Sequence, residues 1–482
     1  MGSSEQPRNP DERDMKRMGR PQQLQRIFGP WGLMGFASVT GAVWQYVLIT
    51  LIWAPSAGGQ YHWISEFAPR KAEKLLSFFI GWLTVLGWQV GLASVCYAVT
   101  LQIQGLVVLT NPEFAFQGWH ASLMTIAVAL CAVFFNTVLV EALPTLEFVM
   151  LVLHFAAYFV FIFVLGFMGP SSTSAEVWNS WENENGWSNT GTAVLVGIIA
   201  PITTLTSADS VCHLAEELKD ASRWLPRVMV AAAASNFAIG FALLVLILYR
   251  AGDIDAAVNS PTGQPYIEIL LNATQSRKGT AVLVAYIVLA LIFCATNVVT
   301  TSSRQLFSFA RDHGVPFSHQ LSQVSEGTHV PVRAIAATIS VTIILSLILI
   351  GSSLAFNIIA TLFGVALLGS YLTSISTLVY QRFSGNPLPT TRFSLGMFGL
   401  PINLATIVFD LFAFVMLFFP AAPNPTTASM NWAVLIFGAV VIFALTFYFI
   451  RTKHIYRSPA QITRPEEEIE MSPSPSREDE KL

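Results

Sequence analysis

Eleven apolar stretches, each close to the length of a membrane-spanning helix, constrain this sequence more than any other feature. The hydrocarbon core of a bilayer is about 30 Å thick, so a helix needs about 20 apolar residues to cross it. The stretches are 31–53, 75–109, 121–140, 148–168, 191–211, 229–249, 279–299, 334–350, 355–380, 398–419 and 432–450. Charged residues make up 11% of the chain, against about 25% in soluble domains. We therefore expect an all-α, polytopic membrane protein.

The longest stretch, 75–109, is too short to cross the bilayer twice. It spans about 52 Å at 1.5 Å per residue. Two minimal spans of about 17 residues would leave almost nothing for a turn. We therefore expect one long, tilted helix here, and about 11 spans in all.

Basic loops predict the orientation, because short loops rich in lysine and arginine stay in the cytoplasm. Loops 212–228, 300–333 and 381–397 are basic and alternate with loops that are not. Loop 250–278 is an exception, but its sequon Asn272-Ala273-Thr274 suits an exterior loop that is glycosylated at Asn272. We therefore expect the basic loops, and with them both ends of the chain, to face the cytoplasm.

The alternation fails near the N-terminus. The tail 1–27 and the loop 54–74 are both basic, yet only the stretch 31–53 separates them. Two segments on the same side of the membrane need an even number of crossings between them, and this stretch is too short for two. Either one helix is missing, or 31–53 does not span.

Five short motifs in the chain are distinctive. They are Ser56-Ala57-Gly58-Gly59-Gln60-Tyr61-His62-Trp63, Gly81-Trp82-Leu83-Thr84-Val85-Leu86-Gly87-Trp88, His213-Leu214-Ala215-Glu216-Glu217 with Pro226-Arg227, Asn259-Ser260-Pro261-Thr262-Gly263, and Phe309-Ala310-Arg311-Asp312-His313-Gly314. Together they resemble the fungal choline/GABA-type permeases of the amino acid–polyamine–organocation superfamily, over about residues 28–457. The resemblance is specific to that family and not to one substrate.

The resemblance implies twelve spans, of which the first ten form two five-helix repeats of inverted topology around a site at mid-membrane. It implies a transmembrane domain at 28–457, composed of a shortened first repeat at 31–168, a second repeat at 191–380 and accessory helices at 398–450. A cytoplasmic tail at 1–27 precedes this domain, and a disordered cytoplasmic tail at 458–482 follows it. The family's second helix would lie just before the Gly-Gly-Gln motif, so the resemblance and the loop charges indicate the same gap.

In such folds the substrate lies where a helix is interrupted, because free backbone groups there bind polar ligands. The first candidate stretch contains Ser38, Val39, Thr40 and Gly41. A second interpretation is that Gly32, Gly35 and Gly41 only permit close helix packing. Gln45 stands where many relatives have glutamate, and its dipole in place of a carboxylate argues against a cationic substrate such as choline.

The second candidate stretch contains Thr203, Ser207 and Asp209. Ionisable residues are costly in lipid, so Asp209 is a candidate for contact with an ammonium group or for proton coupling. The alternative places Asp209 in a hydrated first turn of the next loop. Asn297 is a candidate for a substrate hydrogen bond or for a bond between helices. The charged connection 216–227 is open to two interpretations, a gate closed by salt bridges and a solvated loop.

These observations predict a permease for amino acids or related small amines such as GABA or choline. The resemblance implies alternating access with a proton as coupling ion, and we expect neither an enzyme nor a metal or other cofactor. The alternative is a transport-inactive or truncated paralogue with a regulatory or partner-binding role. The net charge of −3 gives no reason to expect nucleic acid as a partner. We expect the plasma membrane, with the vacuolar membrane as an alternative, and the sequence leaves oligomerisation open.

Overall fold

The computed structural model describes residues 15, 20–40, 58–179, 183, 186–197, 208–385, 388, 392–420, 422–427 and 429–463. Regular structure in this part of the chain is helical, apart from a β bridge between Phe28 and Leu218. The elements up to the middle of the chain are α2 (Pro30–Thr40), α4 (Gln60–Phe67), α5 (Arg70–Thr110), α6 (Gly118–Thr137), η1 (Val140–Ala142), α7 (Leu143–Met168), α8 (Ser174–Asn179), α9 (Thr190–Gly197), η2 (Ala208–Glu217) and α11 (Ala221–Arg250).

The second half continues with helices throughout. Its elements are α12 (Ile254–Val258), α13 (Pro265–Thr274), α14 (Arg277–Arg311), α15 (Ser318–Leu321), α16 (Val332–Ser346), α17 (Ile348–Gly351), α18 (Ser353–Phe383), η3 (Gly396–Phe398), α19 (Gly399–Met416), α20 (Ala433–Phe447), the π-helical turn η4 (Tyr448–Thr452) and α21 (Pro459–Thr463).

Nine helical segments in the described residues are long and apolar enough to cross a membrane. They coincide with nine of the eleven predicted spans, and the stretch 75–109 lies in one helix, α5, as predicted. The remaining two stretches, 31–53 and 191–211, fall partly outside the described residues. The all-α, multi-pass architecture is thus confirmed. The expected gap before α4 lies in residues 41–57, which are also outside the described residues.

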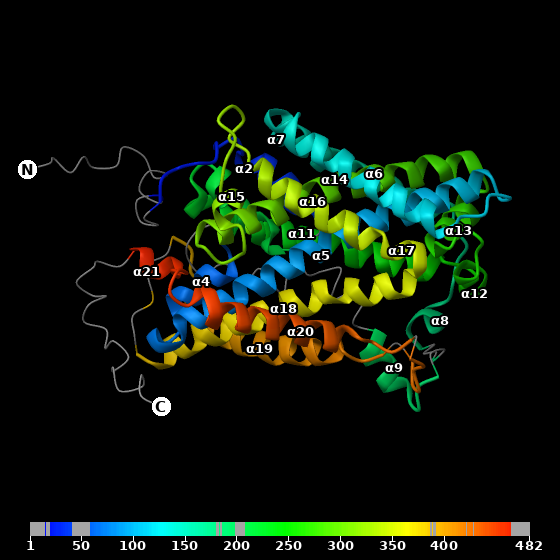
Figure 1. Ribbon diagram of the computed structural model, residues 1–482. Coiled ribbons are helices and arrows are strands. Elements are labelled where there is room, and N and C mark those ends of the chain that lie inside the picture. Colours follow the sequence, from blue (N-terminus) through cyan, green and yellow to red (C-terminus); the bar gives the residue numbers. More distant parts are fainter. Residues whose placement is uncertain are drawn as a thin grey trace, which may run out of the picture.

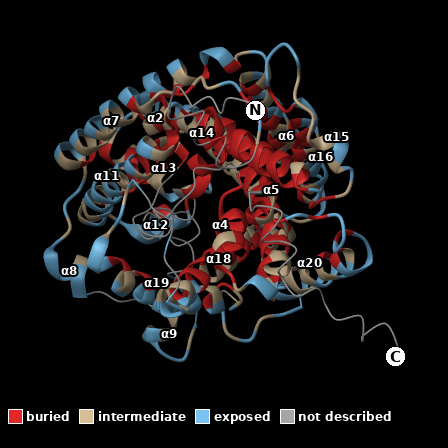
Figure 2. Ribbon diagram, turned by 90° about the vertical axis from the view of Figure 1, so that its left-hand side faces the viewer, coloured by how far each residue is buried: buried red, intermediate tan, exposed pale blue. Residues whose placement is uncertain are grey.

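The centre of the bundle is built from α5, α14 and α18. Helix α5 lies between the other two and packs against both. Small residues allow this packing, since a Cβ atom on Gly81 would lie 2.2 Å from the Phe309 ring and one on Gly91 would lie 2.6 Å from the Phe363 ring. Figure 2 shows buried residues concentrated in these helices, while α7, α11 and α20 turn exposed faces outward. Apolar outer faces of this kind are expected for helices that contact lipid.

The two ends of the bundle differ in what covers them. Figure 1 shows α4 and α21 at one end, and α12 and α13 at the other. The sequence assigns the α4 end to the cytoplasm. At this end, ordered structure continues past residue 458, where the predicted disordered tail 458–482 begins. Residues 459–463 form α21, and Ser458 is fully buried. Composition misses this segment because specific hydrogen bonds, described below, hold it in place.

Candidate functional site

Two glycines allow α2 to lie directly against α7. A Cβ atom on Gly32 would meet Pro144 O at 3.0 Å, and one on Gly35 would meet Glu147 O at 2.1 Å. A side chain at Gly35 therefore fits only if the two backbones separate. The packing interpretation is confirmed for these two glycines. Their close contact also brings the polar end of α2 beside the side chain of Glu147.

Asn297 of α14 joins α2 to α7 through its amide. In the orientation that satisfies both ends of the side chain, Nδ2 donates to Glu147 Oε1 at 2.7 Å and Oδ1 accepts from Thr40 Oγ1 at 3.2 Å. Asn236 of α11 donates to the backbone oxygen of Ser38 at 3.0 Å. Four helices thus converge at the end of α2. We call Thr40, Glu147 and Asn297 the carboxyl cluster.

Glu147 is fully buried, and its hydrogen-bond partners in the described residues are neutral. No ion pair of Glu147 occurs among these residues. An ionised carboxylate without a cation is costly at such a site. The carboxyl cluster is therefore suited to bind a proton or a cationic group.

A second buried carboxylate, Asp209, joins three elements. Its Oδ1 accepts a hydrogen bond from the Tyr371 hydroxyl of α18, and its Oδ2 accepts one from Gln60 Nε2 of α4. His213 Nε2, four residues along η2, lies 3.7 Å from Oδ2. Asp209 is fully buried, so it does not lie in a hydrated turn. Because both oxygens already have protein donors, Asp209 fixes η2 to α4 and α18.

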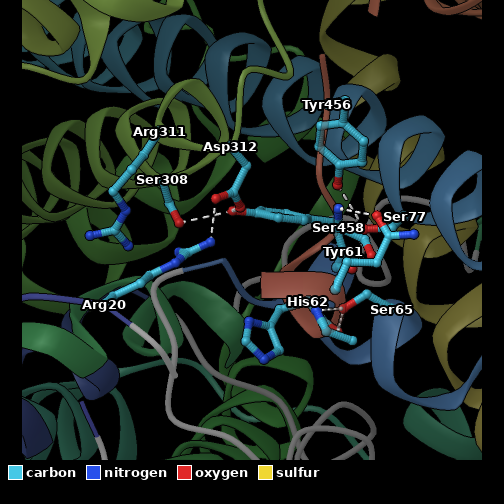
Figure 3. A network of polar contacts seen from close by, with 12 residues as sticks. Arg20, Tyr61, His62, Ser65, Ser77, Ser308, Arg311, Asp312, Tyr456 and Ser458 are labelled. Atoms are coloured by element: carbon cyan, nitrogen blue, oxygen red, sulfur yellow. Dashed lines mark hydrogen bonds and ion pairs between the residues drawn. The ribbon is translucent and has the colours of Figure 1, made fainter. Parts of the chain in front are cut away.

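Buried ion pairs join the N-terminal segment, η2 and α14 at the α4 end of the bundle. Arg20 pairs with Asp312 (Figure 3). Arg311 pairs with Glu216 at 2.6 and 3.1 Å, and Arg304 Nε lies 2.8 Å from Glu217 Oε1. Tyr61 of α4 completes the set, with its hydroxyl 2.9 Å from both Asp312 Oδ2 and Ser308 Oγ. We call these eight side chains the polar lock. The charged stretch that begins at Glu216 therefore forms salt bridges at its start and is not a solvated loop there.

Each charged side chain of the polar lock has a partner of opposite charge. Burial alone would raise the pKa of Glu216, but Arg311 and then Arg20 outweigh it and lower that pKa. Burial and Asp312 both raise the pKa of Tyr61, so its hydroxyl stays a donor. Burial, followed by Arg20, lowers the pKa of His62 to about 3, so its ring is neutral at physiological pH. The 3.8 Å contact between His62 and Glu66 is therefore not an ion pair at that pH.

Backbone hydrogen bonds also hold the N-terminal segment against η2. Phe28 N donates to Glu217 O at 3.1 Å, and Lys219 N donates to Phe28 O at 3.3 Å. Gln22 Nε2 donates to Glu216 O at 2.9 Å. The segment before α2 is thus connected to η2 by a short ladder as well as by charge, and moving α2 requires both to break.

The predicted site residues are distributed over these clusters. Thr40 and Asn297 come together, Ser38 is buried with its backbone oxygen bonded to Asn236, Val39 is half-buried against the core, and Asp209 lies in its own cluster. Gly41, Gln45, Thr203 and Ser207 lie outside the described residues. Asn272 lies in α13, with its side chain half-buried and with Thr274 bonded to Thr280. These placements leave the substrate-binding and glycosylation assignments as predictions.

Sequence reasoning missed Glu147, Gln60 and Tyr371. The apolar stretch 148–168 begins one residue after Glu147, whereas the helix that contains Glu147 begins at Leu143. The signal that could have found it is an acidic residue within the first turns of a span. Gln60 and Tyr371 come from elements far from Asp209 in sequence, so no local pattern links them.

Comparison with known proteins identifies the family. The family model described as amino acid permease matches residues 27–442. A putative amino acid/polyamine transporter of Macrophomina phaseolina is 30% identical over 83% of this chain and 89% of its own length. The choline transporter of Saccharomyces cerevisiae is 29% identical over 82% and 69%, and amino-acid permease 2 of Neurospora crassa is 26% identical over 84% and 74%.

The matched region includes the carboxyl cluster, Asp209 and every residue of the polar lock except Arg20. The family indicates a transporter rather than an enzyme, in agreement with the apolar helices of a multi-pass membrane protein. This chain belongs to the amino acid permease family of the amino acid–polyamine–organocation superfamily.

Proposed function

We propose that this protein is a secondary active carrier of amino acids or related small amines such as GABA or choline. It works by alternating access, is coupled to protons and resides in the plasma membrane. The observation that carries the proposal is the carboxyl cluster, where Glu147 lies buried at the polar end of α2 with neutral neighbours. The proposed substrates and the proton share one feature, a positive charge that Glu147 can balance.

The cluster also answers the objection raised by Gln45. A glutamine at that position removes one carboxylate from the expected site, but Glu147 of α7 supplies another in the cluster with Thr40 at the end of α2. An ammonium group or a proton at Glu147 neutralises the buried charge, so its binding is favoured in either case. Alternate neutralisation by proton and substrate is a simple way to couple their movements.

The polar lock supports the alternating-access part of the proposal. It joins Arg20, just before α2, to Asp312 at the end of α14, and so holds the candidate site closed at the α4 end. Transport requires this end to open. Opening separates the two partners of each buried ion pair, and a buried charge without its partner is unfavourable. Closure by several ion pairs gives two discrete states, as a carrier needs.

Uptake of labelled amino acids, GABA and choline in a permease-deficient host tests the proposal. We expect saturable uptake of at least one of them, stimulated by an inward proton gradient. Glu147→Gln keeps the hydrogen bond to Asn297 in reach but removes the charge, so it should abolish proton stimulation or uptake of a cationic substrate. Asp209→Asn should reduce uptake sharply by loosening α4 and α18.

The matched control is Glu141→Gln, an exposed carboxylate in η1 on the same segment of chain, which should transport normally. Surface delivery of each variant is measured in parallel. Normal delivery with no uptake of any tested amine would contradict the proposal. Unchanged proton stimulation in Glu147→Gln would remove Glu147 from the mechanism.

A further inference from the structure

The chain folds back on itself after its last apolar helix. Residues 456–463 follow the end of α20 and pack against α4 and α5 at the cytoplasmic end, where α21 contacts α4. Tyr456 and Ser458 are fully buried, although both belong to the charged C-terminal part of the sequence. We call residues 456–463 the latch.

Tyr456 connects the latch to the polar lock. The Ser77 hydroxyl of α5 donates to Tyr61 O at 2.8 Å, so the Tyr456 hydroxyl, 2.8 Å from Ser77 Oγ, is the donor in their hydrogen bond. The Tyr456 ring also contacts the Phe309 ring of α14, with centroids 5.9 Å apart. Figure 3 shows Tyr456, Ser77 and Tyr61 in one continuous network with Asp312.

Ser458 and Ala460 secure the other side of the latch. The Ser458 hydroxyl donates to Glu73 Oε1, on the first turn of α5. Ala460 N donates to Ser65 Oγ at 3.2 Å, which in turn donates to His62 O at 2.6 Å. The latch is therefore hydrogen-bonded to α4 directly at the Ser65 hydroxyl and indirectly through Ser77 of α5, and these contacts differ from those that α4 makes with Asp209 and Asp312.

The position of α4 depends on such contacts. With eight residues it is too short to be stable as an isolated helix. Yet it supplies Gln60 to Asp209 and Tyr61 to Asp312, so it connects both buried carboxylates. Whatever holds α4 in place therefore also holds the polar lock closed.

We propose that residues 456–463 are a regulatory latch that stabilises the closed state of the cytoplasmic gate, and that added negative charge at Ser458 releases it. The proposal rests on the proposed function, in which the polar lock is that gate. Its charge dependence follows from the contact with Glu73, because a second anion at Ser458 would face a buried carboxylate. Once the latch has detached from α5 and α4, α4 is free to move.

Accessibility of a cysteine in the lock tests the proposal without any transport measurement. A Ser308→Cys reporter in a Cys131→Ser background is labelled with a maleimide in membrane vesicles, since Cys131 is the exposed native cysteine and the other three are buried. Ser458→Asp should raise the labelling rate by about tenfold or more, and Tyr456→Phe by about fivefold, as expected for losing one ordinary hydrogen bond.

Two controls separate charge from general damage. Ser458→Asp combined with Glu73→Gln removes the repulsion and should restore slow labelling. His454→Asp places the same charge at an exposed position in the same connection and should leave labelling slow. Size-exclusion chromatography and melting temperature in detergent establish that each variant is folded.

Slow labelling in folded Ser458→Asp and Tyr456→Phe overturns the latch, whether or not the protein transports any amine. If Ser458→Asp does not fold, Tyr456→Phe alone decides. If the latch variants label rapidly but no amine is taken up, the latch stands and the transport proposal fails. The two proposals are thus tested separately.

Discussion

The Tyr61 hydroxyl donates a hydrogen bond to Asp312 Oδ2 at 2.9 Å and thereby joins α4 to the C-terminal end of α14. Asp312 also pairs with Arg20, so one carboxylate receives a neutral donor and a cation from two different segments. In the proposed alternating-access mechanism both segments leave Asp312 when this end opens, so the Tyr61 contact would stabilise the closed state directly.

Tyr61→Phe removes this hydrogen bond and keeps the ring packed against Phe309, 5.2 Å away. We expect the open state to gain by about 1 kcal/mol, the usual net strength of one hydrogen bond. The outward-facing population then falls, so the apparent KM for external substrate should rise about fivefold. Initial uptake rates over a range of substrate concentrations measure this.

Ser308→Ala is the matched control, since it removes the other contact of the Tyr61 hydroxyl but leaves the bond to Asp312. Its KM should change less than that of Tyr61→Phe. Equal effects in the two variants would show that the hydroxyl pair, and not the carboxylate, carries the interaction.

Much of the fold follows from apolar length alone. Stretch 75–109 predicted a single helix, and α5 is one, because a bilayer admits no turn within so few residues. The charges at Glu216 and Glu217 indicated a gate or a loop, and only the arrangement of α14 could bring Arg304 and Arg311 to them. Such pairs depend on tertiary packing, which local sequence patterns do not contain.

The candidate site was less predictable than the fold. Thr40 and Asn297 were singled out as polar residues in apolar stretches, and the structure brings them together at Glu147. Glu147 lies just outside stretch 148–168, because a carboxylate at the end of an apolar run does not belong to the run. The order of the latch is not predicted either, because polar composition indicates disorder, whereas Tyr456 and Ser458 are held by hydrogen bonds to Ser77 and Glu73 of α5.

Gly35→Ala should destabilise the protein and displace Glu147. The new Cβ atom would lie 2.1 Å from Glu147 O, a backbone atom that cannot move away without separating α2 from α7. Overpacking of this kind costs about 1–3 kcal/mol or more. The melting temperature in detergent, followed by a thiol-reactive dye that reaches the three buried cysteines on unfolding, should fall by several degrees.

Gly240→Ala is the control for this substitution. Gly240 lies within α11 and has no atom within 4 Å of the position of an added Cβ. Alanine is a better helix former than glycine, so this variant should melt at the same or a higher temperature. A similar fall in both variants would mean that the α2–α7 contact is looser than the structure indicates.

Stability should decline in mild acid because of His62. Burial, followed by Arg20, lowers its folded-state pKa to about 3, below the ordinary value of 6.5. Between these values the unfolded chain binds a proton that the folded protein does not, so this contribution is complete above pH 6.5 and is lost as the pH falls. At pH 5 the loss is about 2 kcal/mol by linkage.

Melting curves of the wild type and His62→Gln between pH 7.5 and 5 test this expectation. Glutamine does not titrate, so the variant should lose less stability over the same range, even if it starts from a lower melting temperature. Parallel pH dependence in the two proteins would show that His62 is already solvated or charged. The range stops above the pH at which Glu216, whose folded pKa is lowered, would begin to lose its own contribution.

Asp410 is the clearest case of a buried polar group without compensation. It lies fully buried on α19, in a face that also contains Asn403 and Thr406 and that packs against α18. Neither carboxylate oxygen has a hydrogen-bond partner in the described residues, and the same holds for Asn403 Nδ2. Because Asp410 is enclosed within this chain, it does not lie on an outer surface that another copy could contact.

Asp410→Leu should therefore raise the stability of the protein, by about 1–3 kcal/mol, since it removes a buried polar group of similar volume that has no partner. The melting temperature measures this, with Thr406→Val as the control, because the Thr406 hydroxyl is satisfied by Ile402 O at 2.9 Å and its loss should change little. A lower melting temperature for Asp410→Leu, with Asp410→Asn unchanged, would instead indicate that Asp410 has a polar partner that stabilises the fold. Transport by Asp410→Leu shows whether Asp410 is needed for function. Unaltered uptake would mean that Asp410 only destabilises the protein, whereas lost uptake in a more stable protein would mean that transport requires this carboxylate.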